Sequence, residues 1–95
     1  MSAIPELLAL PPKLTHREAR AALGGLLQRL GAQTEAQWVV DASALRVFDS
    51  SALAVLLECR RQALTKHKTF AVRGLPAALA GLAGLYGVAE LLPAA

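Results

Sequence analysis

Apolar and polar positions along the chain first predict a short strand followed by a helix. An apolar run at 7–10 is stopped by the proline pair at 11–12, which cannot continue a sheet ladder, so the run predicts a strand. Thr15 and Glu18 have the spacing of a capping box, and leucines then recur at helical spacing up to Gly31. We expect a helix between these points.

The middle of the chain predicts a second strand and a second helix. The run 38–40 is rich in β-favouring residues and closed by Asp41, as expected of a central strand covered on both faces. A loop should follow at 42–48. The pattern is helical from 50 to about 66, and Asp49 or the serine after it can cap that helix.

The third unit repeats this order and completes the domain. The segment 69–72 predicts a strand, Gly74 and Pro76 predict the turn into a helix, and Gly87 suits that helix's end. Three alternations of strand and helix indicate a sheet with at least some parallel pairing, because parallel neighbours need a helical crossover. We expect one domain over residues 1–95.

Composition narrows the class of protein. The chain is 55% hydrophobic and 18% charged, so it should fold, and its 4% aromatic residues leave no row of rings on which single-stranded bases could stack. The net charge of +3 is spread among acidic residues, so we expect no nucleic-acid partner. The uncharged run 74–89 is too short and too interrupted for a membrane span, which requires about 20 apolar residues. We expect no direct membrane insertion.

Signatures of catalysis and metal binding are mostly missing from the sequence. There is no Gly-rich phosphate loop, no histidine pair at metal-ligand spacing and no nucleophile elbow. His16 and His67 occupy contexts where an imidazole is usually solvated, and the lone Cys59 lies at core spacing on the second helix. We therefore expect no catalytic residue, no cofactor and no metal, and a reducing cytoplasm as the location.

Acidic and hydroxyl residues gather around one strand-to-helix connection, 41–53. Taken singly, Asp41 and Ser43 are best explained as turn residues, and residues 49–51 as caps of the second helix. A hydroxyl at a helix N-terminus also lies where backbone donors and the helix dipole favour added negative charge. Ser50 is therefore a candidate switch position.

The second helix has a wide apolar arc. In steps of 100° the arc spans roughly 200°, more than a core-facing stripe requires. Two explanations stay open: a deeply buried helix in a covered sheet, or a docking surface edged by Arg60 and Arg61.

The same stretch resembles the motif of STAS domains, a family that includes bacterial anti-sigma factor antagonists and sulphate-transporter tails. The matching residues are Asp41, Ser43, Asp49, Ser50, Ser51, Ala52 and Leu53. The short length, the turn at 74–76 and the ending at 85–93 are most similar to the MlaB-like branch. Two departures are Ala52, where many members have Gly, and an N-terminal region in which Pro5 and the pair at 11–12 leave little room for the family's opening hairpin.

The resemblance implies an α/β, STAS-type domain with a small mixed β-sheet packed on one side by helices. It implies a non-catalytic accessory subunit of a Mla-type phospholipid-transporting ABC complex, which maintains outer-membrane lipid asymmetry. Its partners would be the ATPase subunit and, through it, the permease, and it would be cytoplasmic and peripheral to the inner membrane. By residue matching, and by extension along the helix that starts there, the partner-binding residues would be Asp49, Ser50, Ser51, Leu53, Leu57, Arg60 and Arg61.

An alternative function uses the same surface. The chain would then be an anti-sigma factor antagonist, switched by phosphorylation of Ser50, and its partner an anti-sigma factor serine kinase. Serine at position 50 favours this alternative, whereas the C-terminal ending favours the transporter subunit.

Overall fold

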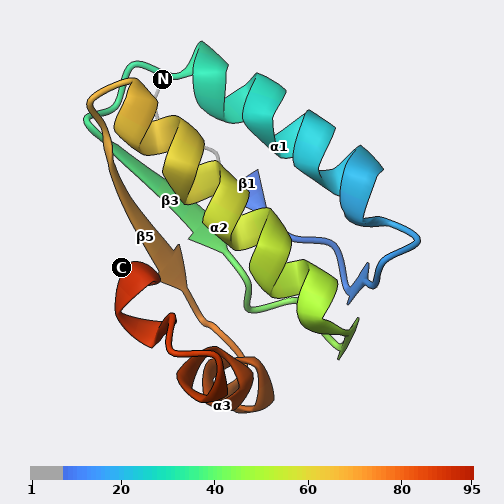
Figure 1. The fold of residues 1–95 in the computed structure, drawn as a ribbon. Coiled ribbons are helices and arrows are strands. Elements are labelled where there is room, and N and C mark those ends of the chain that lie inside the picture. The colour runs from blue at the N-terminus through green and yellow to red at the C-terminus, as the bar shows by residue number, and fades with distance from the viewer. Residues whose placement is uncertain (1–7) are drawn as a thin grey trace.

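A three-stranded parallel sheet lies at the centre of the fold, in a computed structural model that describes residues 8–95 (Figure 1). Its strands, in spatial order, are β1 (Leu8–Ala9), β3 (Gln37–Asp41) and β5 (Thr69–Arg73). Val72 also forms a parallel bridge with Ala94, which brings the C-terminal segment alongside β5. A separate parallel ladder joins β2 (Lys13–Leu14) to β4 (Val47–Phe48).

Two long helices cover one face of this sheet. They are α1 (Ala19–Ala32) and α2 (Ser50–Thr65), and they lie side by side with their N-termini at the same end (Figure 1). Helix α1 packs against β1, and α2 packs against β5. The shorter α3 (Ala77–Leu85) packs against α2, and a 3-10 turn, η1 (Ala89–Leu91), follows it. The predicted α/β architecture is confirmed.

Strand pairing differs from the prediction in two respects. The expected sheet was mixed, but every pairing among residues 8–95 is parallel. The predicted end of the loop at 42–48 is wrong, because Val47 and Phe48 form β4. The carbonyl of Pro12 explains the difference: a proline cannot donate to a ladder, but its oxygen accepts from Arg46 N at 2.7 Å and Val47 N at 3.0 Å. Residues 1–7, which include Pro5 and the first residue of the strand expected at 7–10, lie outside the described residues.

Helix α1 starts later than its capping box predicts. The Glu18 carboxylate accepts hydrogen bonds from the backbone N–H of Thr15 at 2.8 Å and from its hydroxyl at 2.7 Å. The half of the capping box that Glu18 contributes is therefore present. The Glu18 N–H donates to the Thr15 carbonyl at 3.0 Å, which makes a turn of the residues between them. The α-helix therefore begins at Ala19, four residues after Thr15.

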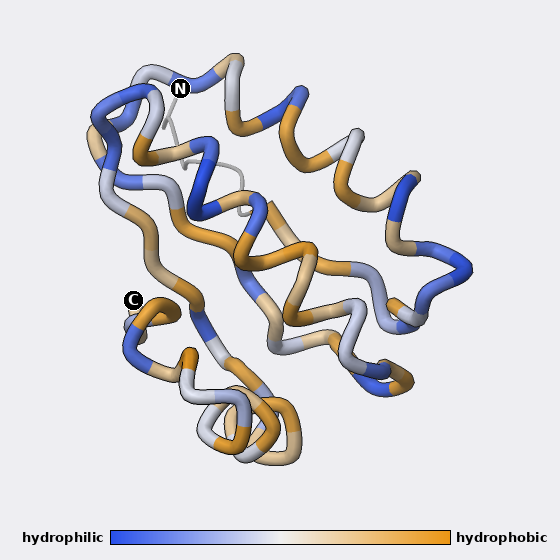
Figure 2. Tube along the Cα trace, viewed as in Figure 1, coloured by the Kyte–Doolittle hydropathy of each residue, from blue (hydrophilic) through white to orange (hydrophobic). Residues whose placement is uncertain are grey.

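The core lies between the sheet and the two long helices. Side chains alternate across a strand, so Trp38, Val40, Phe70 and Val72 all point to the helix-covered face, where each is at most 5% exposed. Figure 2 shows the hydrophobic positions of α1 turned inward and the hydrophilic ones outward. The Trp38 indole N–H has no hydrogen-bond partner within residues 8–95, an arrangement that costs about 1–3 kcal/mol.

Helix α3 differs from the other two in charge. No charged residue occurs between Arg73 and Glu90, and Figure 2 shows no strongly hydrophilic position along this helix. No helix within residues 8–95 has the length and apolar character needed to cross a bilayer.

Candidate functional site

The first half of the motif is a rigid turn at the end of β3. The Asp41 carboxylate accepts a hydrogen bond from the Ser43 backbone N–H at 2.9 Å, and this bond lowers the pKa of Asp41. Ala42 N donates to the Arg73 carbonyl at 2.7 Å, so the turn is held against the end of β5. These contacts agree with the interpretation of Asp41 and Ser43 as turn residues.

Gly74 closes this turn from the other side. Its φ of +67° lies in the left-handed region, and a Cβ placed there would stand 2.7 Å from the Ser43 Cβ. Only glycine gives both the required backbone angle and the close approach. The motif's first half thus forms part of the scaffold that holds the strand ends together.

The second half of the motif starts helix α2. Asp49 is the N-cap, and its carboxylate accepts from the Ser51 backbone N–H at 2.8 Å. The other carboxylate oxygen accepts from the His16 backbone N–H at 3.1 Å and lies 3.3 Å from the His16 ring Nδ1. These hydrogen bonds, the one from Ser51 foremost, lower the pKa of Asp49 to about 2. A full negative charge therefore stands at the start of α2 at neutral pH.

Ser50 is exposed at the first position of α2, directly beside this charge. A group added to its hydroxyl would meet the helix dipole, which favours negative charge, and the Asp49 carboxylate, which opposes it. Because Asp49 already binds the N–H of Ser51, a phosphate would have to share or displace that cap.

A continuous exposed strip follows Ser50 along the helix. We call it the α2 face; its members are Ser50, Ala54, Leu57, Arg61 and Leu64, spaced by three or four residues. Leu57 is half-buried and Leu64 is 49% exposed, so two leucines flank an arginine on the solvent side of the helix. Leucines next to an arginine are typical of a protein interface, where apolar residues and arginine are both common.

One predicted partner-binding residue is not on this surface. Leu53 is 2% exposed and belongs to the core, so the prediction that it extends the docking surface is wrong. Leu53 follows Ser50 by three positions, which is about 300° around the helix. Its side chain therefore lies about 60° from that of Ser50 and points into the core. The same core holds Cys59, as predicted, and burial raises the pKa of its thiol to about 12.

The two predicted arginines lie in different surroundings. Arg61 makes a bidentate ion pair with Glu58, with distances of 2.9 Å and 2.7 Å, and this pair lowers the pKa of Glu58 to about 2. Arg60 is half-buried and has no carboxylate partner within residues 8–95. Arg61 is a member of the α2 face and Arg60 borders it, and of the two only Arg60 has no ion-pair partner within residues 8–95.

A groove between the two long helices adjoins the α2 face. The α1–α2 groove has a volume of about 280 Å³ and is lined by Ala19, Arg20, Leu23, Ser51, Ala54 and Val55. Ser51, whose side chain is half-buried, and Ala54 connect the groove to the start of α2. Sequence reasoning placed no site residue on α1, so it missed both Arg20 and the groove.

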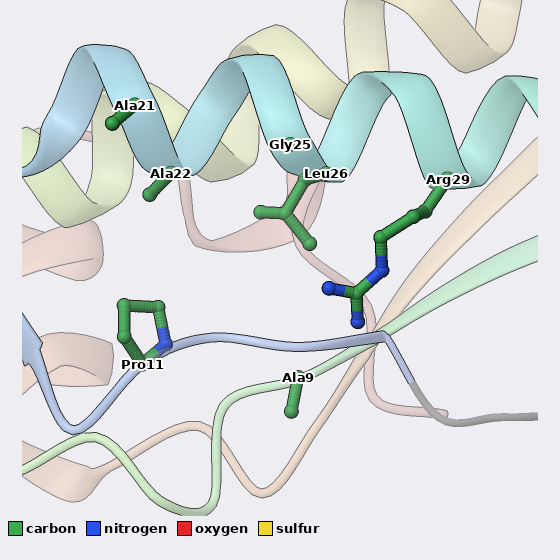
Figure 3. A pocket seen from close by; sticks show the side chains of 7 residues that line it. All are labelled: Ala9, Pro11, Ala21, Ala22, Gly25, Leu26 and Arg29. Carbon is green, nitrogen blue, oxygen red and sulfur yellow. The ribbon is translucent and has the colours of Figure 1, made fainter.

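A second hollow lies on the other side of α1, facing β1. It has a volume of about 270 Å³, and Figure 3 shows the Arg29 side chain directed from α1 toward the β1 segment across a lining of mostly small residues. It contains none of the predicted site residues. Within residues 8–95, no three side chains of the metal-ligating types come together.

The contact between His16 and Asp49 could not be predicted from the sequence. The 33-residue separation of His16 from Asp49 gives no periodic signal, and the sequence predicts only a solvated imidazole in the first turn of a helix. The ring is indeed 75% exposed, yet it stands beside the N-cap of α2 and joins the start of α1 to the start of α2.

Comparison with known proteins bears on the whole chain. A family model described as "Mlab, STAS domain" matches residues 3–93, which include every predicted site residue. A search of curated proteins found no match.

Proposed function

We propose, because the chain belongs to the STAS domain family and is most like its MlaB-type members, that it is a non-catalytic accessory subunit of a phospholipid-transporting ABC complex. Membership of the family supports an accessory or regulatory role. The finer proposal is that the chain binds the ATPase subunit and, through it, the permease. It would act in the cytoplasm, at the inner membrane, in a system that keeps outer-membrane lipids asymmetric.

The α2 face is the observation that carries this proposal. An accessory subunit has to offer a partner a surface that its own fold does not need, and two leucines and an arginine follow Ser50 on the solvent side of α2. The N-cap Asp49 fixes where this helix begins and so fixes the position of Ser50. Docking requires no chemistry from these groups, and we assign the chain no catalytic step.

A second candidate function is favoured by the exposure of Ser50. Its hydroxyl lies at a helix start and is open to a kinase, as an anti-sigma factor antagonist would need. The ionised Asp49 beside it opposes an added phosphate, and the family match carries the MlaB description. We therefore rank this function below the transporter subunit.

Affinity capture from cells of the source organism tests the two functions against each other. The tagged chain and its Ser50→Glu variant are each purified, and their direct partners are identified by mass spectrometry. We expect the wild-type chain to retain an ABC ATPase and its permease, and the variant to retain less, because a charge is added at the docking surface. Recovery of an anti-sigma factor serine kinase in place of the ATPase would support the alternative.

A further inference from the structure

The charges on the two long helices are unevenly paired. The segments 16–32 and 49–65, which hold α1, α2 and their first turns, carry five arginines and three carboxylates. All three carboxylates are engaged: Glu18 by Thr15, Asp49 by Ser51 and His16, and Glu58 by Arg61 and Gln62. Four arginines have no carboxylate partner within residues 8–95, namely Arg17, Arg20, Arg29 and Arg60. These two segments thus carry two more arginines than carboxylates, five against three.

Arg20 is the member of this set that lines the α1–α2 groove. The rest of the lining is apolar except for Ser51. A volume of about 280 Å³ is below the usual range for a small-molecule site, and suits an inserted side chain better than a whole ligand. The N-termini of α1 and α2 lie at this end of the molecule (Figure 1), but the carboxylates of Glu18 and Asp49 stand beside them and offset their dipoles. The positive charge in the groove lining is therefore that of Arg20.

We propose that the α1–α2 groove receives an acidic segment of the partner, which inserts one apolar side chain between the helices and pairs a carboxylate with Arg20. This inference rests on the proposed function, because the partner is the ATPase subunit docked on the adjoining α2 face. Charge complementarity selects the occupant: a basic or neutral segment would leave Arg20 unpaired beside apolar surface.

Two pairs of matched variants test the groove; the Arg20 pair does so outside the α2 face, whereas Ala54 belongs to both surfaces. Arg20→Glu reverses the charge at the groove, and Arg29→Glu makes the same change on the opposite side of α1. Ala54→Leu partly fills the groove, and Ala21→Leu is its control, an exposed alanine that lines the hollow facing β1. Alanine and leucine have similar helix propensities, so neither leucine variant should disturb its helix. Thermal unfolding checks that all four variants fold.

The measurement is the affinity of the purified full chain for its ATPase subunit, by isothermal titration calorimetry, with Ser50→Glu included. We expect Arg20→Glu and Ala54→Leu each to raise Kd roughly tenfold or more, and their controls to leave it within about twofold.

If Ser50→Glu weakens binding but Arg20→Glu and Ala54→Leu do not, the groove inference is wrong and the proposed function stands. If the wild-type chain does not bind the ATPase, both are wrong. If Arg20→Glu lowers binding to anionic phospholipid vesicles and leaves ATPase affinity unchanged, the occupant is a membrane surface and the inference is overturned.

Discussion

Gly74→Ala should destabilise the domain far more than the loss of an ordinary turn glycine. At φ = +67° an alanine pays the left-handed penalty of about 1–2 kcal/mol. Its Cβ would also stand 2.7 Å from the Ser43 Cβ and 3.1 Å from the Ser43 Cα. Neither atom can move away by a side-chain rotation, so the turn at 41–45 must shift, at an overpacking cost of about 1–3 kcal/mol. We expect a total loss of about 2–5 kcal/mol.

Gly87 provides the matched control. Its φ of +73° is nearly the same, but a Cβ there meets no atom within 4 Å. Gly87→Ala should therefore lose stability only through the left-handed backbone conformation. The entropy that alanine removes from the unfolded chain is common to both variants and cancels in their difference. Gly74→Ala should therefore be less stable than Gly87→Ala by about 1–3 kcal/mol.

Urea unfolding followed by circular dichroism measures both losses, as shifts of the midpoint at constant m-value. In a Ser43→Gly background the 2.7 Å contact is absent, so Gly74→Ala should cost less there than in the wild-type chain. Equal losses for Gly74→Ala and Gly87→Ala, with no coupling to position 43, would refute the close approach between the two turns.

Three further predictions address α2. Leu53→Ala should cost about 2–5 kcal/mol because the side chain is buried, whereas Leu57→Ala on the α2 face should cost less than about half of that; equal losses would contradict the assignment of faces. The Cys59 thiol, buried and with its pKa at about 12, should react with Ellman's reagent at pH 8 at least about 100-fold more slowly in the folded chain than in urea, and rapid labelling without urea would argue against its burial. The folded-state pKa of Asp49 is lowered from 3.8 to about 2, so the stability contributed by its ionised form is present above about pH 4 and is lost as the pH falls through about 2. Asp49→Asn should flatten this part of the stability curve in acid titrations of the unfolding midpoint, and an unchanged curve would show that the cap contributes nothing.

The elements with strong periodicity could be predicted from sequence. Helix α2 begins at Ser50 with Asp49 as its cap, as the pattern of residues indicated, because a cap interaction is local and its residue types are few. The core role of Cys59 followed in the same way from helical spacing. The strand β4 could not be predicted, since it pairs with residues more than thirty positions earlier and is only two residues long.

The site was predictable in part for the same reason. Asp49 and Ser51 are close in sequence, and the hydrogen bond between them at the start of α2 agrees with the capping role predicted for these residues. Leu53 was placed on the wrong face, because a wide apolar arc does not say which of its edges the sheet and α3 will cover. The contact of His16 with Asp49 and the position of Arg20 in the groove depend on how α1 packs beside α2, which no local pattern specifies.

The central claim is that the α2 face binds an ABC transporter ATPase, and site-specific photo-crosslinking in cells tests it most directly. A photoreactive phenylalanine analogue replaces Leu64, which is 49% exposed on the α2 face and does not line the groove, and in a second strain replaces Tyr86, which is 57% exposed at the end of α3. We predict a crosslink from position 64 to the ATPase subunit and none from position 86. A crosslink to the ATPase from position 86 alone, or to a serine kinase from position 64, would contradict the claim.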